Sequence, residues 1–433
     1  MAFIEPFRAW HYNDYLSERI AELTASISET KFKQPETALY AQPFHSFHLA
    51  SPVDVPPFEN VDRRLKNWKI DKVIKQEALP TIFPYEQTYQ LPNSENFVKQ
   101  KGFIVLIKIE EWQNKVVLPH EKTFAEAVQF RTEILKNTYL HTSPTHGLYQ
   151  DNELQLEPYL EESLQVPFYE VVDEQGTQHK LSKIQDWNVI RLFKEVLNPL
   201  QVIIADGHHR YESSIRFMQH CKAQNPQHTG NEAYNYHLIY LTNSIQNPLG
   251  LLPTHRLLKN LTNFSATDFL AKVAQYFEIE NLSSPNVLVE KPFEKAWAFG
   301  LVLPDEKAYY LKLRKEAFDK EALTWQAPFS LRNLDIAILH RFLIEKVANL
   351  HEGNQFEHLD FAQYSEDCIR KVRSREVQVA ILTHKVPLQE IFDVCQSGYL
   401  MPQKATYFFP KVLSGLLFAT VLENEFYPIY LPR

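Results

Sequence analysis

The sequence predicts an α+β fold with a mixed β-sheet, and two features support this prediction. In the middle of the chain, an apolar strand (Pro199–Ala205), a short polar turn, a helix and a second apolar strand (Tyr236–Asn243) follow one another. This β-α-β order is typical of a mixed sheet whose chemically active groups lie at the strand ends. Beyond about Asn260 the alternation of helices and strands restarts, so a second α+β domain is expected.

The N-terminal region is expected to cover this core. It contains a helical stretch at Asn13–Ser28, a proline-rich irregular stretch at Phe44–Phe58 and a short helix at Val61–Trp68. Next, Phe97–Trp112 alternates apolar and polar residues around a β-branched centre, which predicts a half-buried strand. Helical periodicity follows over Lys122–Thr138.

The C-terminal region is expected to alternate in the same way, after a further strand segment at Gly250–Leu258. Its expected elements are a helix at Ala266–Phe277, strands at 295–303 and 307–314, a helix at Leu334–Leu350 and a strand at Val377–His384. At about 150 residues per domain, a chain of 433 residues holds two or three domains. We therefore predict a covering segment at 1–96, a core at 97–262 and a C-terminal domain at 263–433.

Glycine is scarce, and its spacing excludes several nucleotide-binding and catalytic motifs. The chain has 10 glycines, where an average usage of about 7% would give about 30, and no two of them lie closer than 17 positions. A P-loop, a dinucleotide-binding turn, a kinase glycine-rich loop and a hydrolase nucleophile elbow each need at least two glycines within a few residues. All four are therefore excluded. The net charge of −8 also argues against direct binding to nucleic acid.

The cysteines and the hydropathy pattern predict a cytoplasmic protein. Cys221, Cys368 and Cys395 are far apart, which indicates neither a zinc site nor a disulfide framework. The N-terminal segment carries charged residues where a signal peptide would be apolar, and the longest uncharged apolar stretch, Val412–Leu422, is too short to span a bilayer. We expect no membrane association.

The clearest chemical signal is the sequence DGHHR, which begins at Asp206. Gly207 allows a tight turn into a helix, and the first amides of a helix attract anions. Arg210 adds a bidentate phosphate donor, and His208 and His209 can donate hydrogen bonds or bind a metal. Asp206 can hold Mg²⁺ or act as a base. The alternative is that Asp206 caps the helix and the histidines pack beside it.

A second cluster, HEKT, lies just before the helix predicted over 122–138. His120 and Glu121 can supply a metal ligand or a general base. Glu121 and Thr123 equally suit a helix start, and for this cluster alone the capping interpretation is preferred. Arg131 follows on the same helix and adds a further cation.

Two further clusters carry cations that can reach an anionic ligand. In PTHR, the residues Thr254, His255 and Arg256 follow a strand and offer phosphate or substrate contacts. In MPQKATYFFPK, Lys404 and Lys411 lie at the two ends of an apolar, strand-like run. For each lysine taken singly, an ordinary solvated side chain is an equally good interpretation.

These motifs give the chain a resemblance to a known family. The segments IEPFRAW, IFPYEQTY, HEKT, IIADGHHRYES, LPTHR, LDIAILH and MPQKATYFFPK occur in this order over nearly the whole chain. The chain resembles the family called domain of unknown function 1015. Its DGHHR stretch is also similar to the ParB and sulfiredoxin-like fold, in which a glycine turn and a basic motif hold nucleotide phosphates. An ADP-dependent free-serine kinase of that fold has a similar motif.

The resemblance implies a Mg²⁺-dependent phosphotransferase that uses ATP or ADP and a small hydroxyl-bearing acceptor such as an amino acid. Such a reaction needs positioning, cations and a carboxylate more than covalent chemistry. Asp206 or Glu121 would hold the metal or take the proton, with His209 as a third catalytic candidate. The residues expected to bind the nucleotide or its phosphates are Gly207, His208, His209, Arg210, His120, Thr123, Arg131, Thr254, His255, Arg256, Lys404 and Lys411.

Two alternatives stay open. The first is a ParB-like module that senses a nucleotide without transferring phosphate. The second is a metal-dependent hydrolase. Its metal ligands would be His120, Glu121, Asp206, His208 and His209.

Overall fold

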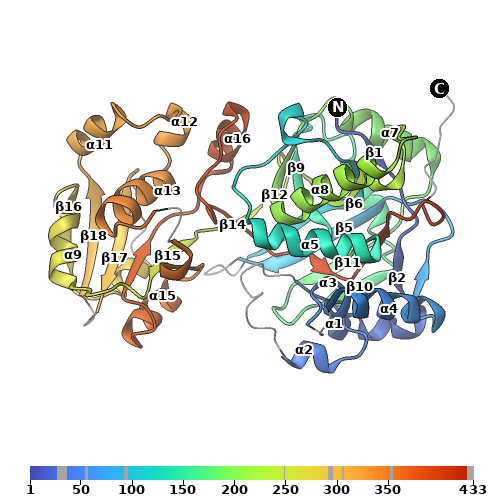
Figure 1. The fold of residues 1–433 in the computed structure, drawn as a ribbon, viewed down its shortest axis with the longest axis horizontal. Helices are drawn as coiled ribbons and strands as arrows, with labels where there is room; N and C mark the ends of the chain where they lie inside the picture. Colours follow the sequence, from blue (N-terminus) through green and yellow to red (C-terminus); the bar gives the residue numbers. More distant parts are fainter. Residues whose placement is uncertain are drawn as a thin grey trace. The chain divides into compact units, whose positions relative to one another are not determined.

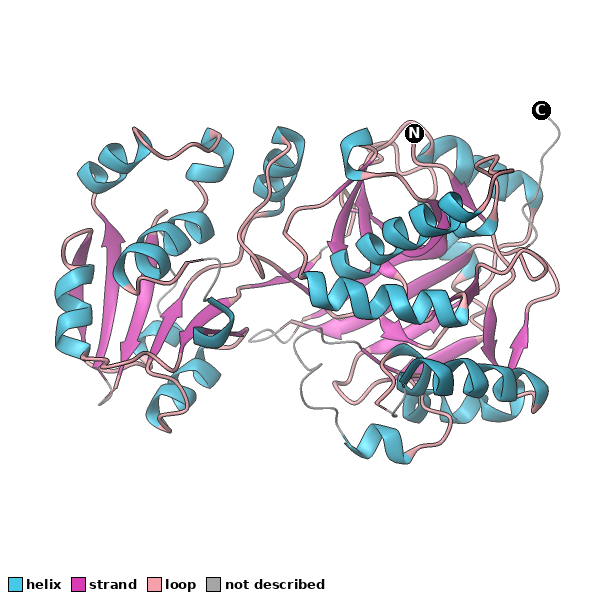
Figure 2. Cartoon of the chain, viewed as in Figure 1, coloured by secondary structure: helices cyan, strands magenta, loops and turns pink. Residues whose placement is uncertain are grey.

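A computed structural model describes residues 1–26, 37–53, 57–91, 96–247, 249–290, 296–304, 307–351 and 355–426. The chain forms two compact units. The first comprises Met1–Pro119, Thr123–Gly250 and Pro410–Arg433, and the second comprises His120–Lys122 and Leu251–Phe409. Each unit is a β-sheet with helices packed against it (Figure 2), so the predicted α+β class with a mixed sheet is confirmed. No described helix is long and apolar enough to cross a membrane.

The two units divide the chain at positions other than the predicted 1–96, 97–262 and 263–433. The N-terminal region shares a unit with the strands that follow it, and the chain returns to this unit at Pro410. The division into three domains at 1–96, 97–262 and 263–433 stays a prediction.

The first unit is built, within the described residues, on a nine-stranded mixed sheet. Its strands in spatial order are β10 (Tyr169–Val172), β11 (Gln178–Leu181), β5 (Phe83–Gln90), β6 (Phe97–Lys108), β13 (Tyr236–Asn243), β9 (Thr145–Tyr149), β12 (Val202–Asp206) and β7 (Val117–Leu118), with β1 (Ile4–Glu5) paired to β6. Strand β12 is antiparallel to β9, whereas β13 is parallel to β9. The strands before and after the central helix are therefore antiparallel to each other, with β9 between them.

Helices pack on this sheet, and short strand pairs complete the unit. Helices α5 and α8 lie side by side (Figure 1). The helices are η1 (Asp14–Arg19), α1 (Ile20–Leu23), α2 (Thr37–Ala41), α3 (Phe47–Ala50), α4 (Pro57–Ile70), η3 (Trp112–Asn114), α5 (Ala125–Thr138), α6 (Glu157–Ser163), α7 (Trp187–Leu197), α8 (His208–Gln224) and η4 (Ala233–Asn235). The short pairs are β2 (Trp10–Tyr12) with β4 (Ile74–Gln76), β3 (Ala25–Ser26) with β22 (Leu413–Ser414), and β8 (Leu140–His141) with β23 (Ala419–Thr420).

The central strands are buried on both faces. In β6, Phe103 and Val105 belong to one apolar cluster, and Ile104 and Leu106, which point the opposite way, belong to another. The second cluster includes residues of the N-terminal helices, such as Trp68. The strand predicted over 97–112 is therefore present as β6, but its centre, residues 103–107, is buried on both faces, because a layer distant in sequence covers the second face.

Gly102 lets strands β6 and β13 approach each other closely. A Cβ atom at this position would lie 2.1 Å from the carbonyl oxygen of Leu241. We expect Gly102→Ala to lower the free energy of unfolding by about 1–3 kcal/mol, because the strands would have to move apart. Urea denaturation of the variant measures this change. An unchanged midpoint and slope would show that the strand pair absorbs the methyl group.

Two N-terminal predictions need correction. The helix expected at 13–28 is a 3-10 helix followed by one α-helical turn, because the chain turns extended at Thr24 and pairs as β3 with β22. The irregular stretch expected at 44–58 contains α3 and the start of α4. Residues 27–28 and 54–56 lie outside the described residues.

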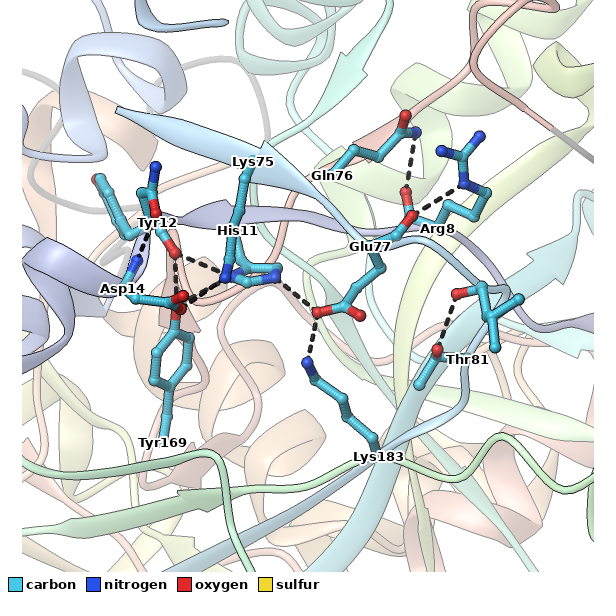
Figure 3. Close-up of polar contacts among 12 residues, drawn as sticks. Arg8, His11, Tyr12, Asp14, Lys75, Gln76, Glu77, Thr81, Tyr169 and Lys183 are labelled. Atoms are coloured by element: carbon cyan, nitrogen blue, oxygen red, sulfur yellow. Dashed lines mark hydrogen bonds and ion pairs between the residues drawn. The ribbon is translucent and has the colours of Figure 1, made fainter. Parts of the chain in front are cut away.

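A polar cluster ties the N-terminal region to the sheet (Figure 3). His11 is hydrogen-bonded through Nε2 to Glu77 Oε1 at 2.7 Å and through Nδ1 to the Tyr169 hydroxyl at 2.9 Å. Lys183 forms an ion pair with the same Glu77 oxygen. Burial alone would raise the pKa of Glu77, but hydrogen bonds from His11 and Lys183 outweigh it and lower this pKa to about 2.

The second unit has, within the described residues, a six-stranded antiparallel sheet. In spatial order its strands are β16 (Phe277–Leu282), β18 (Lys307–Leu313), β17 (Ala298–Leu303), β20 (Val379–Leu382), β15 (His255–Leu258) and β19 (Leu359–Ala362). The other elements are the short strands β14 (Gly250–Leu252) and β21 (Tyr407–Phe409) and the helices α9 (Ala266–Val273), α10 (Val287–Glu290), α11 (Lys315–Ala322), α12 (Phe329–Arg332), α13 (Asp335–Ile338), η5 (Leu339–Val347), α14 (Gln355–His358), α15 (Ser365–Arg373) and α16 (Leu388–Ser397). The single helix expected at 334–350 is α13 continued by the π-helix η5.

Candidate functional site

The predicted site residues divide between the two units. The DGHHR turn, Thr123, Arg131 and Lys411 belong to the first unit. The second unit holds the rest, which are His120, Glu121, Thr254, His255, Arg256 and Lys404.

The DGHHR turn has the predicted strand–turn–helix form. Strand β12 ends at Asp206, and Gly207 precedes helix α8 in the left-handed conformation, with φ of +90°. A side chain at Gly207 would also collide with the Arg210 guanidinium, since a Cβ atom there would lie 2.6 Å from its NH2 nitrogen. The backbone conformation therefore favours glycine, and a side chain there would also displace the Arg210 guanidinium. The Arg210 side chain folds back over the start of its own helix.

Two cations share the carboxylate at the end of β12. Arg210 NH2 donates to Asp206 Oδ2 at 2.7 Å, and Lys411 Nζ forms an ion pair with Asp206 Oδ1. Arg210 NH1 also donates to Ser143 Oγ at 2.8 Å and to the Pro144 carbonyl. We call Asp206, Arg210, Lys411 and Ser143 the Asp206 cluster.

The Asp206 cluster has a surplus of positive charge and of hydrogen-bond donors. Asp206 supplies one negative charge to the two cations that it holds. The Arg210 side chain is only 10% exposed, and its Nε is buried without a hydrogen-bond partner. A buried donor of this kind is costly unless a ligand accepts from it. The cluster therefore suits an oxyanion at the start of α8.

The histidines of the turn and Arg131 are buried in the first unit. His209 Nε2 accepts a hydrogen bond from the Phe124 amide at 2.9 Å, and its ring stacks on the Phe124 ring. It thus holds the residue that precedes α5, whose Arg131 donates to the Ala50 carbonyl at 2.6 Å. His208 is almost fully buried. Roles in phosphate binding or catalysis for His208, His209, Arg131 and Thr123 stay predictions.

Sequence reasoning missed two buried residues close to the Asp206 cluster. His146 of β9 lies opposite Asp206 in the sheet and bonds through Nε2 to Thr242 Oγ1 at 2.8 Å. Gln87 of β5 donates to the carbonyl of Lys411 at 3.1 Å. Gln87 falls in the IFPYEQTY segment, but His146 lies in no motif, so only the strand pairing reveals it.

Burial of histidines makes the first unit sensitive to acid. Burial lowers the pKa of His141 to about 4 and that of His146 to about 3, from an ordinary value of 6.5. The unfolded chain therefore binds more protons than the folded chain between about pH 6.5 and pH 4. The stability that these histidines contribute is present above pH 6.5 and is lost as the pH falls through the folded pKa values.

We expect the free energy of unfolding to fall as the pH is lowered from 6.5 to 4, by up to about 1.4 kcal/mol per pH unit for each buried histidine. Urea denaturation at several pH values measures this slope. His146→Gln should make it shallower, since glutamine keeps a hydrogen-bonding amide without a titrating ring. Equal slopes in both proteins would contradict this assignment.

In the second unit, the PTHR and MPQKATYFFPK segments meet at Arg256. This side chain is fully buried, and burial lowers its pKa to about 9. It donates to the Thr254 and Gln403 carbonyls, the latter at 3.0 Å, and to His340 Nε2 at 3.1 Å. The Arg256 guanidinium also lies over the Phe361 ring, 5.1 Å from its centroid.

The HEKT segment joins the same part of the second unit. His120 bonds through Nε2 to Thr406 Oγ1 at 2.8 Å, and its carbonyl accepts from the Met401 amide at 2.8 Å. The Glu121 charge acts on Arg256 and opposes the fall in the arginine pKa. Lys404 occupies the left-handed region with φ of +53°. Three of the four sequence clusters thus contribute residues to one region of this unit.

The His255 side chain is hydrogen-bonded to Thr383 and Ser365. Its Nδ1 accepts from the Thr383 amide at 3.2 Å, and its Nε2 is hydrogen-bonded to Ser365 Oγ at 3.2 Å. Burial, helped by the nearby Arg256 charge, lowers its pKa to about 3. His255 is therefore neutral at physiological pH, which does not favour an ionic contact with phosphate.

The magnesium ligands predicted from the sequence are Asp206 and Glu121. Among the described side chains, no group of three or more His, Cys, Asp or Glu residues is placed to hold a metal ion. The two predicted metal ligands belong to different units, and both oxygens of Asp206 are bonded to cations. The magnesium site at Asp206 and Glu121 and the five-ligand hydrolase alternative both stay predictions.

The fold and the Asp206 cluster define an α+β protein with a cationic site at a helix N-terminus. The chain belongs to the family described as "Protein of unknown function (DUF1015)", whose model matches residues 4–337. The predicted family is thereby confirmed. A search of curated proteins finds no match.

A comparison with solved structures finds matches that are remote in sequence. A free serine kinase in complex with AMP is 11% identical, with 78% of this chain and 97% of that chain covered and a TM-score of 0.37. A conserved hypothetical protein from Pyrococcus furiosus is 11% identical over 73% and 95% of the two chains, with a TM-score of 0.36. A C-terminally truncated SbnI from Staphylococcus aureus is 11% identical over 72% and 85%, with a TM-score of 0.35.

Proposed function

We propose that this protein binds a nucleotide at the start of α8 and transfers a phosphoryl group to a small hydroxyl-bearing molecule such as an amino acid. One observation carries the proposal: two cations share a single carboxylate at a glycine-led helix N-terminus, and Arg210 keeps a buried Nε without a partner. Free helix amides and a guanidinium fork are the donors that proteins use for phosphate. ATP and ADP are the proposed nucleotides.

In this proposal Asp206 has two successive roles. Without ligand it forms ion pairs with both Arg210 and Lys411. A nucleotide phosphate replaces it on these cations, which releases the carboxylate to accept the proton of the acceptor hydroxyl. The acceptor oxygen then bonds to the terminal phosphorus of the nucleotide, whose bond to the bridging oxygen breaks, and the shortened nucleotide leaves.

The proposal also includes two further residues, a metal ion and a fold assignment. Glu121 and His209 are further candidates for proton transfer. Mg²⁺ is proposed as an ion that enters on the phosphates, because proteins often hold it through substrate phosphates and few side chains. We also propose that the first unit has a ParB and sulfiredoxin-like fold, and the DGHHR motif is the basis for this assignment.

A thermal-shift screen against ATP, ADP, CTP and GTP, with and without Mg²⁺, tests the proposal. A ligand that binds only the folded protein raises the unfolding midpoint by mass action, so weak binding is detectable at high ligand concentration. We expect a shift with ATP or ADP. No shift with any nucleotide at millimolar concentration would refute nucleotide binding, and a shift without phosphoryl transfer to any hydroxy amino acid would favour the nucleotide-sensing alternative.

A further inference from the structure

The guanidinium of Arg256 is a fully buried cation without a bonded counter-ion. Its acceptors are the carbonyls of Thr254 and Gln403 and the ring of His340, all of them neutral groups. Among the described residues, Glu121 is the carboxylate whose charge acts on it, and no ion pair joins the two side chains. Burying a charge that is not paired is costly. A negatively charged group beside Arg256 would relieve this cost.

Two buried hydroxyls without hydrogen-bond partners lie at the same end of the sheet. They belong to Thr254 and Thr383. Strands β15 and β20 are antiparallel, with Arg256 opposite Ile381, and Thr254 and Thr383 lie just beyond the paired residues at this end. The Thr383 amide donates to His255 Nδ1 at 3.2 Å, and Arg256 donates to the Thr254 carbonyl, so both threonines lie beside the start of β15. Buried hydroxyls are normally satisfied, so two at one end of a sheet need an explanation.

We propose that Arg256, Thr254 and Thr383 form an oxyanion-binding site within the second unit, for a phosphate or carboxylate group. A guanidinium offers a planar fork of donors that matches both groups, and each hydroxyl adds one donor. Its residues all belong to the second unit, and the inference does not rest on the proposed function.

In this proposal the anion replaces the Gln403 carbonyl as a hydrogen-bond acceptor for Arg256. This carbonyl accepts from Arg256 NH2 at 3.0 Å and lies in a turn with Lys404, whose φ of +53° is uncommon for a residue with a side chain. Release of this hydrogen bond would free one guanidinium nitrogen to donate to the anion. Thr383 is the new residue of the site, since it lies in none of the four sequence clusters.

Calorimetric titration of inorganic phosphate and of acetate into the full-length Arg210→Ala protein tests this inference. That background removes the main phosphate donor of the Asp206 cluster. We expect at least one of the two anions to bind, and Thr383→Val to weaken its binding at least tenfold. Thr383→Ser should restore it, because serine keeps the hydroxyl. Thr324→Val, which removes a hydroxyl of the second unit that donates to the Glu321 carbonyl, should bind like its parent.

The two anions distinguish the ligand classes. Tighter binding of phosphate supports a phosphate-bearing ligand, and tighter binding of acetate supports a carboxylate. Thr383→Val should leave the unfolding midpoint unchanged or raise it, because the hydroxyl that it removes has no hydrogen-bond partner among the described residues. Thr254→Val should weaken anion binding as Thr383→Val does. Absence of binding of both anions, or equal affinity with and without the Thr383 hydroxyl, would overturn the inference. Failure of nucleotide binding to the wild-type protein would refute the proposed function alone.

Discussion

Arg210→Ala should weaken ADP or ATP binding by about 100-fold or more while the protein stays folded. Arg210 supplies a fork of charged donors, and each hydrogen bond to a charged group contributes about 1.5–3 kcal/mol. Loss of two such bonds corresponds to about 3 kcal/mol or more, and each 1.4 kcal/mol is a factor of ten in affinity. In the free protein, Lys411 remains on Asp206 when the guanidinium is removed.

Isothermal titration of the wild-type and variant proteins measures this loss. Arg216→Ala is the matched control, because Arg216 lies on the same helix with its side chain 42% exposed and pairs with Glu212. The control should bind nucleotide like the wild type. Arg210→Lys should be intermediate, since lysine keeps the charge without the fork. An Arg210→Ala affinity within threefold of wild type would place the phosphates elsewhere.

Asp206→Asn should lower the rate of phosphoryl transfer by about 10²- to 10⁴-fold, the range for loss of a general base. Asparagine has nearly the same shape but cannot take the acceptor proton. Nucleotide binding should be kept or tightened, because the variant leaves Arg210 and Lys411 without their internal counter-ion.

Transfer from labelled ATP or ADP to serine and related hydroxy amino acids, together with nucleotide titration, separates these two effects. Asp62→Asn is a suitable control, because Asp62 forms a surface ion pair with Lys66. A variant that transfers phosphate at the wild-type rate would exclude Asp206 as the base. A variant that loses nucleotide affinity would contradict the exchange of Asp206 for phosphate.

The local part of the site could be predicted from the sequence. Strand β13 spans the predicted Tyr236–Asn243, and the buried strand β12 leads through Gly207 into α8 as expected. These features depend on apolar patterning and on one glycine, which act over a few residues. The β-α-β order did not reveal that β9 lies between β12 and β13, because strand order depends on contacts distant in sequence.

The long-range part could not be predicted. Lys411 meets Asp206 across 205 positions, because the chain returns to the first unit after completing the second. Nothing local to either residue signals this pairing. The same holds for Thr383, whose amide donates to His255 because the antiparallel strands β15 and β20 bring these distant residues together. Burial of β6 on both faces also depends on distant residues, which a strand's own alternation cannot reveal.

The most direct test of the central claim is a crystal structure of the protein with ADP. The account predicts a phosphate within hydrogen-bond distance of the first amides of α8 and of the Arg210 guanidinium, with Asp206 no longer bonded to both Arg210 and Lys411. A nucleotide bound elsewhere, with the Asp206 cluster unchanged, would contradict it.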